Sequence, residues 1–173
     1  MADTKALAAI FAAAKVLVVD DEHYMRKVVR TLLMSIGVRT VYEAADGRAG
    51  LELIRSVAPD VVIVDWEMPG LDGADFVRMV RSPVSFPYPD VPIIMLTGHG
   101  ERSRVVEAVQ VGVNEFLLKP VSSKALQDRM VAVLTNPRPV VQSGDYYGPV
   151  PRKLLAGVHS DTDRALTNLV LVN

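Results

Sequence analysis

The residues of this sequence best placed to do chemistry are carboxylates that follow apolar runs. Asp20 and Asp21 come directly after the apolar run 16–19, and Asp65 comes directly after the run 61–64. Unbroken β-branched runs of this length are typical of strands that are buried on both faces of a parallel sheet. Because ligands of such sheets bind just beyond the carboxyl ends of the strands, we expect the three carboxylates to share one crevice.

A shared crevice makes these carboxylates repel one another, which raises at least one pKa unless a cation neutralises them. An all-oxygen set of ligands suits a hard ion such as Mg²⁺ better than zinc. The sequence therefore predicts a Mg²⁺ site at Asp20, Asp21 and Asp65. The alternative is a structural network of ion pairs with Lys119, but three acids against one base leave a surplus of buried negative charge.

The elements that must position these residues follow from the alternation of β-branched runs with helix-period segments. Such alternation predicts an α/β fold, a doubly wound five-stranded parallel sheet with helices on both faces. The expected strands are 15–20, 39–44, 61–65, 92–97 and 114–118, and the expected helices are 23–36, 47–57, 72–82, 102–111 and 122–135.

Residues 1–14 form an Ala-rich extension before the domain, which we place at 15–136. We expect an amphipathic helix with Leu7, Ile10 and Phe11 on one face, packed on the domain or on a second copy. A secretory signal is the alternative interpretation, and Asp3 disfavours it because that region of a signal is positively charged.

Residues 137–173 contain repeated prolines and glycines, so we expect an irregular tail laid across the surface. A short helix over 161–171 is predicted near its end, with Leu166, Leu169 and Val170 as the apolar side. The tail is either a surface strap or a peptide that docks on a partner.

The composition excludes several classes of function. There are 20 acidic and 19 basic residues, so no global basic field supports nucleic-acid binding. The absence of cysteine rules out disulfides and cysteine-based zinc sites and suits a reducing compartment. No apolar stretch reaches the roughly 20 residues of a membrane-spanning helix, so we expect a cytoplasmic protein without membrane contact.

Two further polar residues follow the last two expected strands: Thr97 and Lys119, the latter before Pro120. Carboxylates, a hydroxyl and an ammonium group at one edge of a sheet suit phosphoryl transfer. Four motifs in this order resemble the receiver domain of two-component response regulators: Val-Val-Asp-Asp-Glu (18–22), Val-Asp-Trp-Glu-Met-Pro-Gly-Leu-Asp-Gly (64–73), Leu-Thr-Gly (96–98) and Lys-Pro (119–120). The resemblance implies the flavodoxin-like (βα)5 receiver fold.

The resemblance also implies a role for each matching residue. Asp65 is expected to accept the phosphoryl group, and Asp20, Asp21, Asp65 and the backbone carbonyl of Glu67 to hold Mg²⁺. Lys119 is expected to contact a phosphoryl oxygen.

Other implied roles concern switching and tuning. Thr97 is expected to hydrogen-bond the phosphoryl group and Phe116 to turn inward as a consequence, although a core hydroxyl and an ordinary core aromatic remain alternatives. Glu67 and His99 are expected to tune hydrolysis of the aspartyl phosphate, unless they are merely exposed polar groups. The residues expected to dock the kinase are Tyr24, Met25 and Pro120, the last of these after a cis peptide bond.

We therefore expect a single-domain response regulator and not an enzyme with an external substrate. It would be phosphorylated by a histidine kinase or a histidine phosphotransfer protein and would signal through contact with an unidentified target protein. One alternative is an intermediate carrier in a phosphorelay. Another is a phosphorylation-independent scaffold, with a homodimer formed through the fourth-helix and fifth-strand face or through the extensions.

Overall fold

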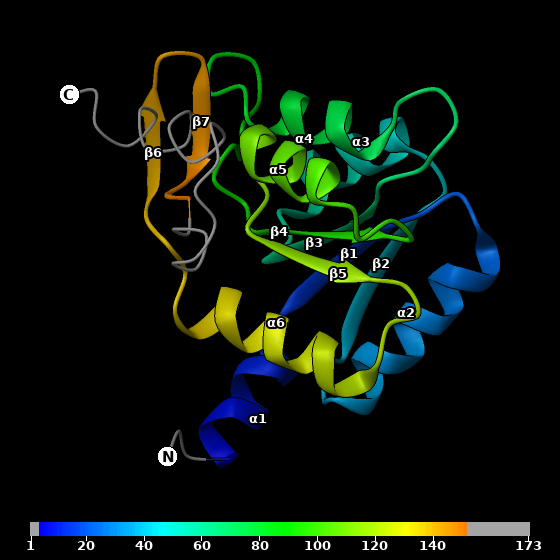
Figure 1. The fold of residues 1–173 in the computed structure, drawn as a ribbon. Coiled ribbons are helices and arrows are strands. Elements are labelled where there is room, and N and C mark those ends of the chain that lie inside the picture. The colour runs from blue at the N-terminus through cyan, green and yellow to red at the C-terminus, as the bar shows by residue number, and fades with distance from the viewer. Residues whose placement is uncertain (1–3, 152–173) are drawn as a thin grey trace.

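The computed structural model describes residues 4–151, and their central element is the predicted parallel sheet (Figure 1). Its five strands lie in the order β2-β1-β3-β4-β5, and each strand and helix predicted within residues 15–136 lies within two residues of its observed bounds. The strands are β1 (Lys15–Val19), β2 (Thr40–Ala44), β3 (Val61–Asp65), β4 (Ile93–Thr97) and β5 (Glu115–Leu118). The helices are α1 (Thr4–Ala13), α2 (His23–Ser35), α3 (Gly47–Val57), α4 (Gly73–Val80), α5 (Arg102–Val111) and α6 (Ser123–Thr135).

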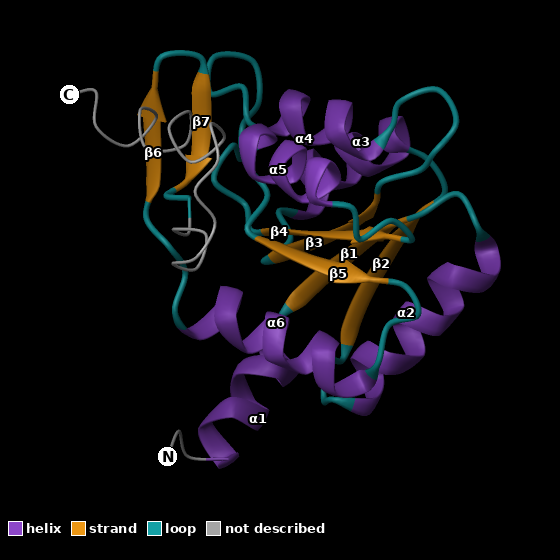
Figure 2. Ribbon diagram, in the orientation of Figure 1, coloured by secondary structure: helices purple, strands orange, loops and turns teal. Residues whose placement is uncertain are grey.

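Helices cover both faces of the sheet, as Figure 2 shows, with α3, α4 and α5 on one face and α2 and α6 on the other. The alternation of side chains along β1 divides the core accordingly. Leu17 and Val19 enter the cluster under α3, α4 and α5, whereas Val16 and Val18 enter the opposite cluster. Because β1, β3 and β4 are buried on both faces, their polar residues are confined to the ends, where the site lies.

The helices that follow the strands begin at polar caps. Asp46, Asp72 and Ser122 each accept a hydrogen bond from a backbone N–H of the first turn, at 2.8, 2.8 and 3.1 Å. These caps satisfy donors that a helix start leaves unpaired. In the described part of the chain, no helix combines the length and the apolar character needed to cross a membrane.

The N-terminal helix α1 packs on the domain, as one of the two expected arrangements requires. Phe11 is only 1% exposed and Leu7 packs against the same cluster as α2 and α6. Ile10, which we expected on the same apolar face, stays exposed. The helix is therefore held mainly through its last turn.

The prediction of irregular structure after residue 136 is wrong for residues 140–149. Strands β6 (Val140–Ser143) and β7 (Tyr146–Pro149) pair as an antiparallel hairpin. Gly144 and Asp145 form a two-residue turn, with Gly144 at φ 56°, between segments rich in β-branched and aromatic residues. The predicted helix over 161–171 lies outside the described residues.

The hairpin is fastened to the domain, so the expectation of a segment laid on the surface holds here. Arg138 donates to the carbonyl oxygen of Val150 at 2.6 Å and to that of Asn114. The Tyr147 hydroxyl donates to the Asp90 carboxylate. The backbone of the hairpin also lies against Gly112, where a Cβ would come within 2.8 Å of a hairpin carbonyl oxygen.

Arg81 lies beneath this hairpin and is 5% exposed. Its guanidinium group donates to three backbone carbonyls and one side-chain amide at 2.6–2.9 Å. The acceptors belong to Pro89, Val91, Gly112 and Asn114. Arg81 thus ties the loop before β4 to the loop before β5.

Candidate functional site

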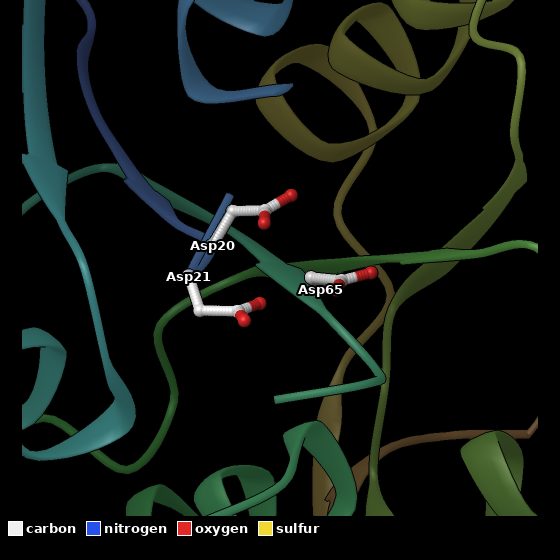
Figure 3. A group of neighbouring side chains, drawn as sticks. All are labelled: Asp20, Asp21 and Asp65. Atoms are coloured by element: carbon white, nitrogen blue, oxygen red, sulfur yellow. The ribbon is translucent and has the colours of Figure 1, made fainter. Parts of the chain in front are cut away.

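The register of β1 and β3 brings the carboxylates together. Val19 of β1 pairs with Val64 of β3, so Asp20 and Asp65 follow side by side at the carboxyl edge of the sheet. With Asp21 they form a group whose carboxylate oxygens lie within 4.8 Å of one another (Figure 3). Asp20 and Asp65 are buried, at 0% and 2% exposure, and Asp21 is exposed.

Lys119 reaches this group from the end of β5. Its ammonium nitrogen lies 2.8 Å from Asp65 Oδ1 and 3.8 Å from Asp20 Oδ2. The peptide bond between Lys119 and Pro120 is cis, as predicted. One cation therefore faces three carboxylates, as the sequence indicated.

One oxygen of this group has no hydrogen-bond partner. Asp20 Oδ1 accepts from the backbone N–H of Glu22 at 2.8 Å, whereas Asp20 Oδ2 is buried and receives no hydrogen bond from the described residues. A buried carboxylate oxygen without a donor is costly unless a cation binds it. The set of ligands therefore fits a hard divalent ion.

Burial also dominates the electrostatics of the pocket. It raises the pKa of Asp65 to about 6, although the hydrogen bond and positive charge of Lys119 oppose the shift. Burial likewise raises the pKa of Asp20. For Lys119, burial acts to lower the pKa, but the hydrogen bond to Asp65 and the surrounding carboxylates leave it raised.

Thr97 ends β4 beside this group and is 1% exposed. Its hydroxyl oxygen accepts a hydrogen bond from the backbone N–H of His99 at 3.0 Å. Its carbonyl oxygen accepts from the backbone N–H of Lys119 at 2.8 Å. The hydroxyl is thus held by the loop after β4 at the same edge of the sheet as the carboxylates.

Glu67 and His99 contact each other, which the sequence did not predict. Their carboxylate oxygen and ring Nε2 lie 2.6 Å apart, and both side chains are about half exposed. They follow Asp65 and Thr97 by two residues, so the pair joins the loops after β3 and β4.

The other residues singled out from the sequence lie at the surface. Phe116 is partly exposed on β5 and packs against the core cluster below α5. Tyr24 is 75% exposed, Met25 is partly exposed and Pro120 is exposed. All four are accessible, and their roles stay predictions.

Sequence reasoning missed three residues that shape the pocket. Arg26 of α2 donates to the backbone oxygen of Asp20 at 2.7 Å. Gly73 begins α4 so close to β3 that a Cβ there would clash with the Asp65 backbone, and its position after the cap Asp72 was the available signal. Arg104 of α5 stacks 5.0 Å from the ring of Trp66.

Comparisons with known proteins agree with this geometry. The family model described as "Response regulator receiver domain" matches residues 16–131. Chemotaxis protein CheY-3 of Vibrio cholerae is 34% identical over 67% of this chain and 88% of its own. Chemotaxis protein CheY1 of Helicobacter pylori is 37% identical over 69% and 96%.

Solved structures give the same result. The structure of CheY4 of Vibrio cholerae has a TM-score of 0.64 and 36% identity, covering 70% of this chain and 98% of that one. The Francisella response regulator 1452 receiver domain has a TM-score of 0.65 and 28% identity, covering 72% and 99%. With three aspartates gathered at the carboxyl edge of its sheet, the chain belongs to the response regulator receiver domain family.

Proposed function

We propose that Asp65 accepts a phosphoryl group from a phosphohistidine. The observation that carries this is the 2.8 Å contact between Asp65 and Lys119 within a group of three carboxylates. In the transfer, an Asp65 oxygen forms a bond to phosphorus while the phosphorus–nitrogen bond of the donor breaks. A receiver of this kind is a signalling protein and turns over no external substrate.

Mg²⁺ is the ion that we propose for the pocket. Asp20, Asp21, Asp65 and the backbone carbonyl of Glu67 would hold it, and the unpartnered Asp20 Oδ2 is the best-defined ligand. When bound, the ion would offset negative charge on the phosphoryl oxygens.

Lys119 and Thr97 are proposed to recognise the phosphoryl oxygens. The ammonium group of Lys119 lies within hydrogen-bonding distance of Asp65, so it can offset negative charge on the oxygens of a phosphoryl group that Asp65 receives. The Thr97 hydroxyl, which donates to the backbone carbonyl oxygen of His99 at 3.5 Å, would donate to the phosphoryl group instead. The inward turn of Phe116 would follow, since Phe116 lies on the next strand.

The proposed phosphodonor is a histidine kinase or a histidine phosphotransfer protein of the cytoplasm. Tyr24, Met25 and Pro120 would form part of its docking surface, because all three are accessible and adjoin pocket residues in the sequence. The proposed output is a phosphorylation-dependent contact with a target protein, as the resemblance to chemotaxis response regulators suggests. A homodimer through α5 and β5 stays a prediction.

The test is labelling with acetyl phosphate and with a histidine kinase, in Mg²⁺ and in EDTA. We expect labelling in Mg²⁺ only, and none in Asp65→Asn. The exposed Asp75→Asn, a matched change on α4, should label normally. Labelling of Asp65→Asn at another residue would contradict the assignment, and failure of the wild-type chain to label would favour the scaffold alternative.

A further inference from the structure

A groove with a volume of about 270 Å³ is lined by residues of α5, β5 and α6 and of the loops beside them. Its apolar wall consists of side chains from α5, the following loop and β5, and three of them, Val105, Val109 and Phe116, are partly exposed. The apolar lining residues are Val105, Ala108, Val109, Val113 and Phe116.

The described chain ends beside this groove. Arg138 lines the groove and also donates to the carbonyl oxygen of Val150 at 2.6 Å. The pairing of β6 with β7 holds residues 140–149 in place, so the segment after Pro151 starts at the groove. The described part of the chain therefore ends at this face of the domain, and 22 residues, 152–173, follow in the sequence.

The sequence of that segment matches the groove in chemistry. The stretch 161–171 places Leu166, Leu169 and Val170 on one side at helical spacing, which suits an apolar wall. It carries two carboxylates and one guanidinium group, those of Asp161, Asp163 and Arg164, whereas the polar lining of the groove includes two guanidinium groups and one carboxylate, those of Arg129, Arg138 and Glu115.

We propose that residues 161–171 dock in this groove of their own chain and cover Phe116. An extended chain of the length of residues 152–160 spans up to roughly 30 Å. This is enough for Leu166, Leu169 and Val170 to reach the groove. A tether this short gives the segment an effective concentration in the millimolar range, so even weak apolar contacts favour the docked state over a free partner.

Docked in this way, residues 161–171 would compete with a target protein for the surface around Phe116. Any target that binds over Phe116 must displace residues 161–171, and phosphorylation and docking must influence each other if they favour different positions of Phe116. This consequence rests on the proposed phosphoacceptor function, whereas the docking itself does not.

The test is paramagnetic NMR of the full chain in EDTA without a phosphodonor, so it does not depend on phosphorylation. The chain contains no cysteine, so Asn168→Cys places a nitroxide label at one position only, on the side of the segment away from Leu166. We expect the methyl signals of Val105 and Val109 to lose most of their intensity. Val41, on β2 at the opposite edge of the sheet, should keep its signal.

Two variants of the labelled chain provide the matched comparison. Leu166→Asp should restore the signals, whereas Leu171→Asp, the same chemical change on the other side of the segment, should leave them broadened. Equal intensity at Val105 in labelled and unlabelled chains would overturn the proposal and leave the groove to a partner. Broadening of an isotope-labelled chain by a separate nitroxide-labelled chain, without broadening within one chain, would overturn it in favour of a second copy.

Discussion

The two ends of the sheet bury charged side chains in opposite ways. At the carboxyl end, Asp20 and Asp65 share one cation, and Asp20 Oδ2 has no hydrogen-bond partner among the described residues. At the amino ends of β4 and β5, Arg81 forms no ion pair with a carboxylate of residues 4–151, yet carbonyl and amide oxygens accept from all three of its nitrogens.

The difference shows which end is built for stability and which for binding. Burial lowers the pKa of Arg81 to about 10, which still leaves the group charged at neutral pH. Its hydrogen bonds offset the cost of burying that charge. The buried carboxylates of Asp20 and Asp65 are compensated only in part, by the Glu22 N–H and the Lys119 ammonium group, and their pKa values are raised. The pocket therefore gains most from a ligand that supplies positive charge.

The largest effect on stability is expected from Arg81→Met. The substitution keeps much of the volume but leaves buried carbonyl oxygens without a donor, so the free energy of unfolding should fall by roughly 3 kcal/mol or more. Denaturant titration measures it. The control Arg78→Met removes an exposed guanidinium that pairs only at the surface and should change stability by less than about 0.5 kcal/mol. Equal losses of unfolding free energy in Arg81→Met and Arg78→Met would contradict the view that the Arg81 end of the sheet is built for stability.

A pH effect of similar size is expected at the other end, in EDTA. Folded Asp65 keeps its proton up to a pKa of about 6, whereas the unfolded carboxyl releases it near 3.8. Between these values the folded chain binds more protons, so this contribution to stability is lost as the pH rises, up to about 3 kcal/mol. The free energy of unfolding of the wild type should therefore fall relative to Asp65→Asn from pH 4 to 7. Parallel curves for the two chains would contradict the raised pKa.

Asp20→Asn should separate stability from binding. The change removes a buried charge with an unpartnered oxygen, so the free energy of unfolding in EDTA should rise by about 1 kcal/mol. Mg²⁺ affinity should fall roughly tenfold or more. The fluorescence of Trp66, the single tryptophan, can follow the Mg²⁺ titration. Asp21→Asn is the control: its carboxylate is exposed, so affinity should fall without a gain in stability.

The smallest effect is expected from Glu67→Ala. The side chain pairs with His99 at a half-exposed position, where such pairs contribute at most about 1 kcal/mol. The lifetime of the aspartyl phosphate should therefore shorten by no more than about fivefold. Mg²⁺ affinity should persist, because only the backbone of Glu67 is a proposed ligand. Release of inorganic phosphate measures the lifetime. A much larger change, or loss of Mg²⁺ binding, would give the Glu67 side chain a direct role.

The sequence predicts the carboxyl end of the sheet far better than the amino end. Apolar runs followed by Asp20 and Asp65 carry both the strand assignment and the site, because parallel strands end at one edge. The network around Arg81 has no such signature, since most of its acceptors are backbone oxygens that any residue supplies. The hairpin was missed although Gly144-Asp145 gave a turn signal, because the surrounding prolines indicated irregular chain.

The most direct test is a crystal structure of the chain with Mg²⁺ and beryllofluoride, which mimics the phosphoryl group. We expect the ion on Asp20 Oδ2 and Asp65, and beryllofluoride on Asp65 in contact with Lys119 and Thr97. An unmodified Asp65, with the ion bound elsewhere or absent, would contradict the account.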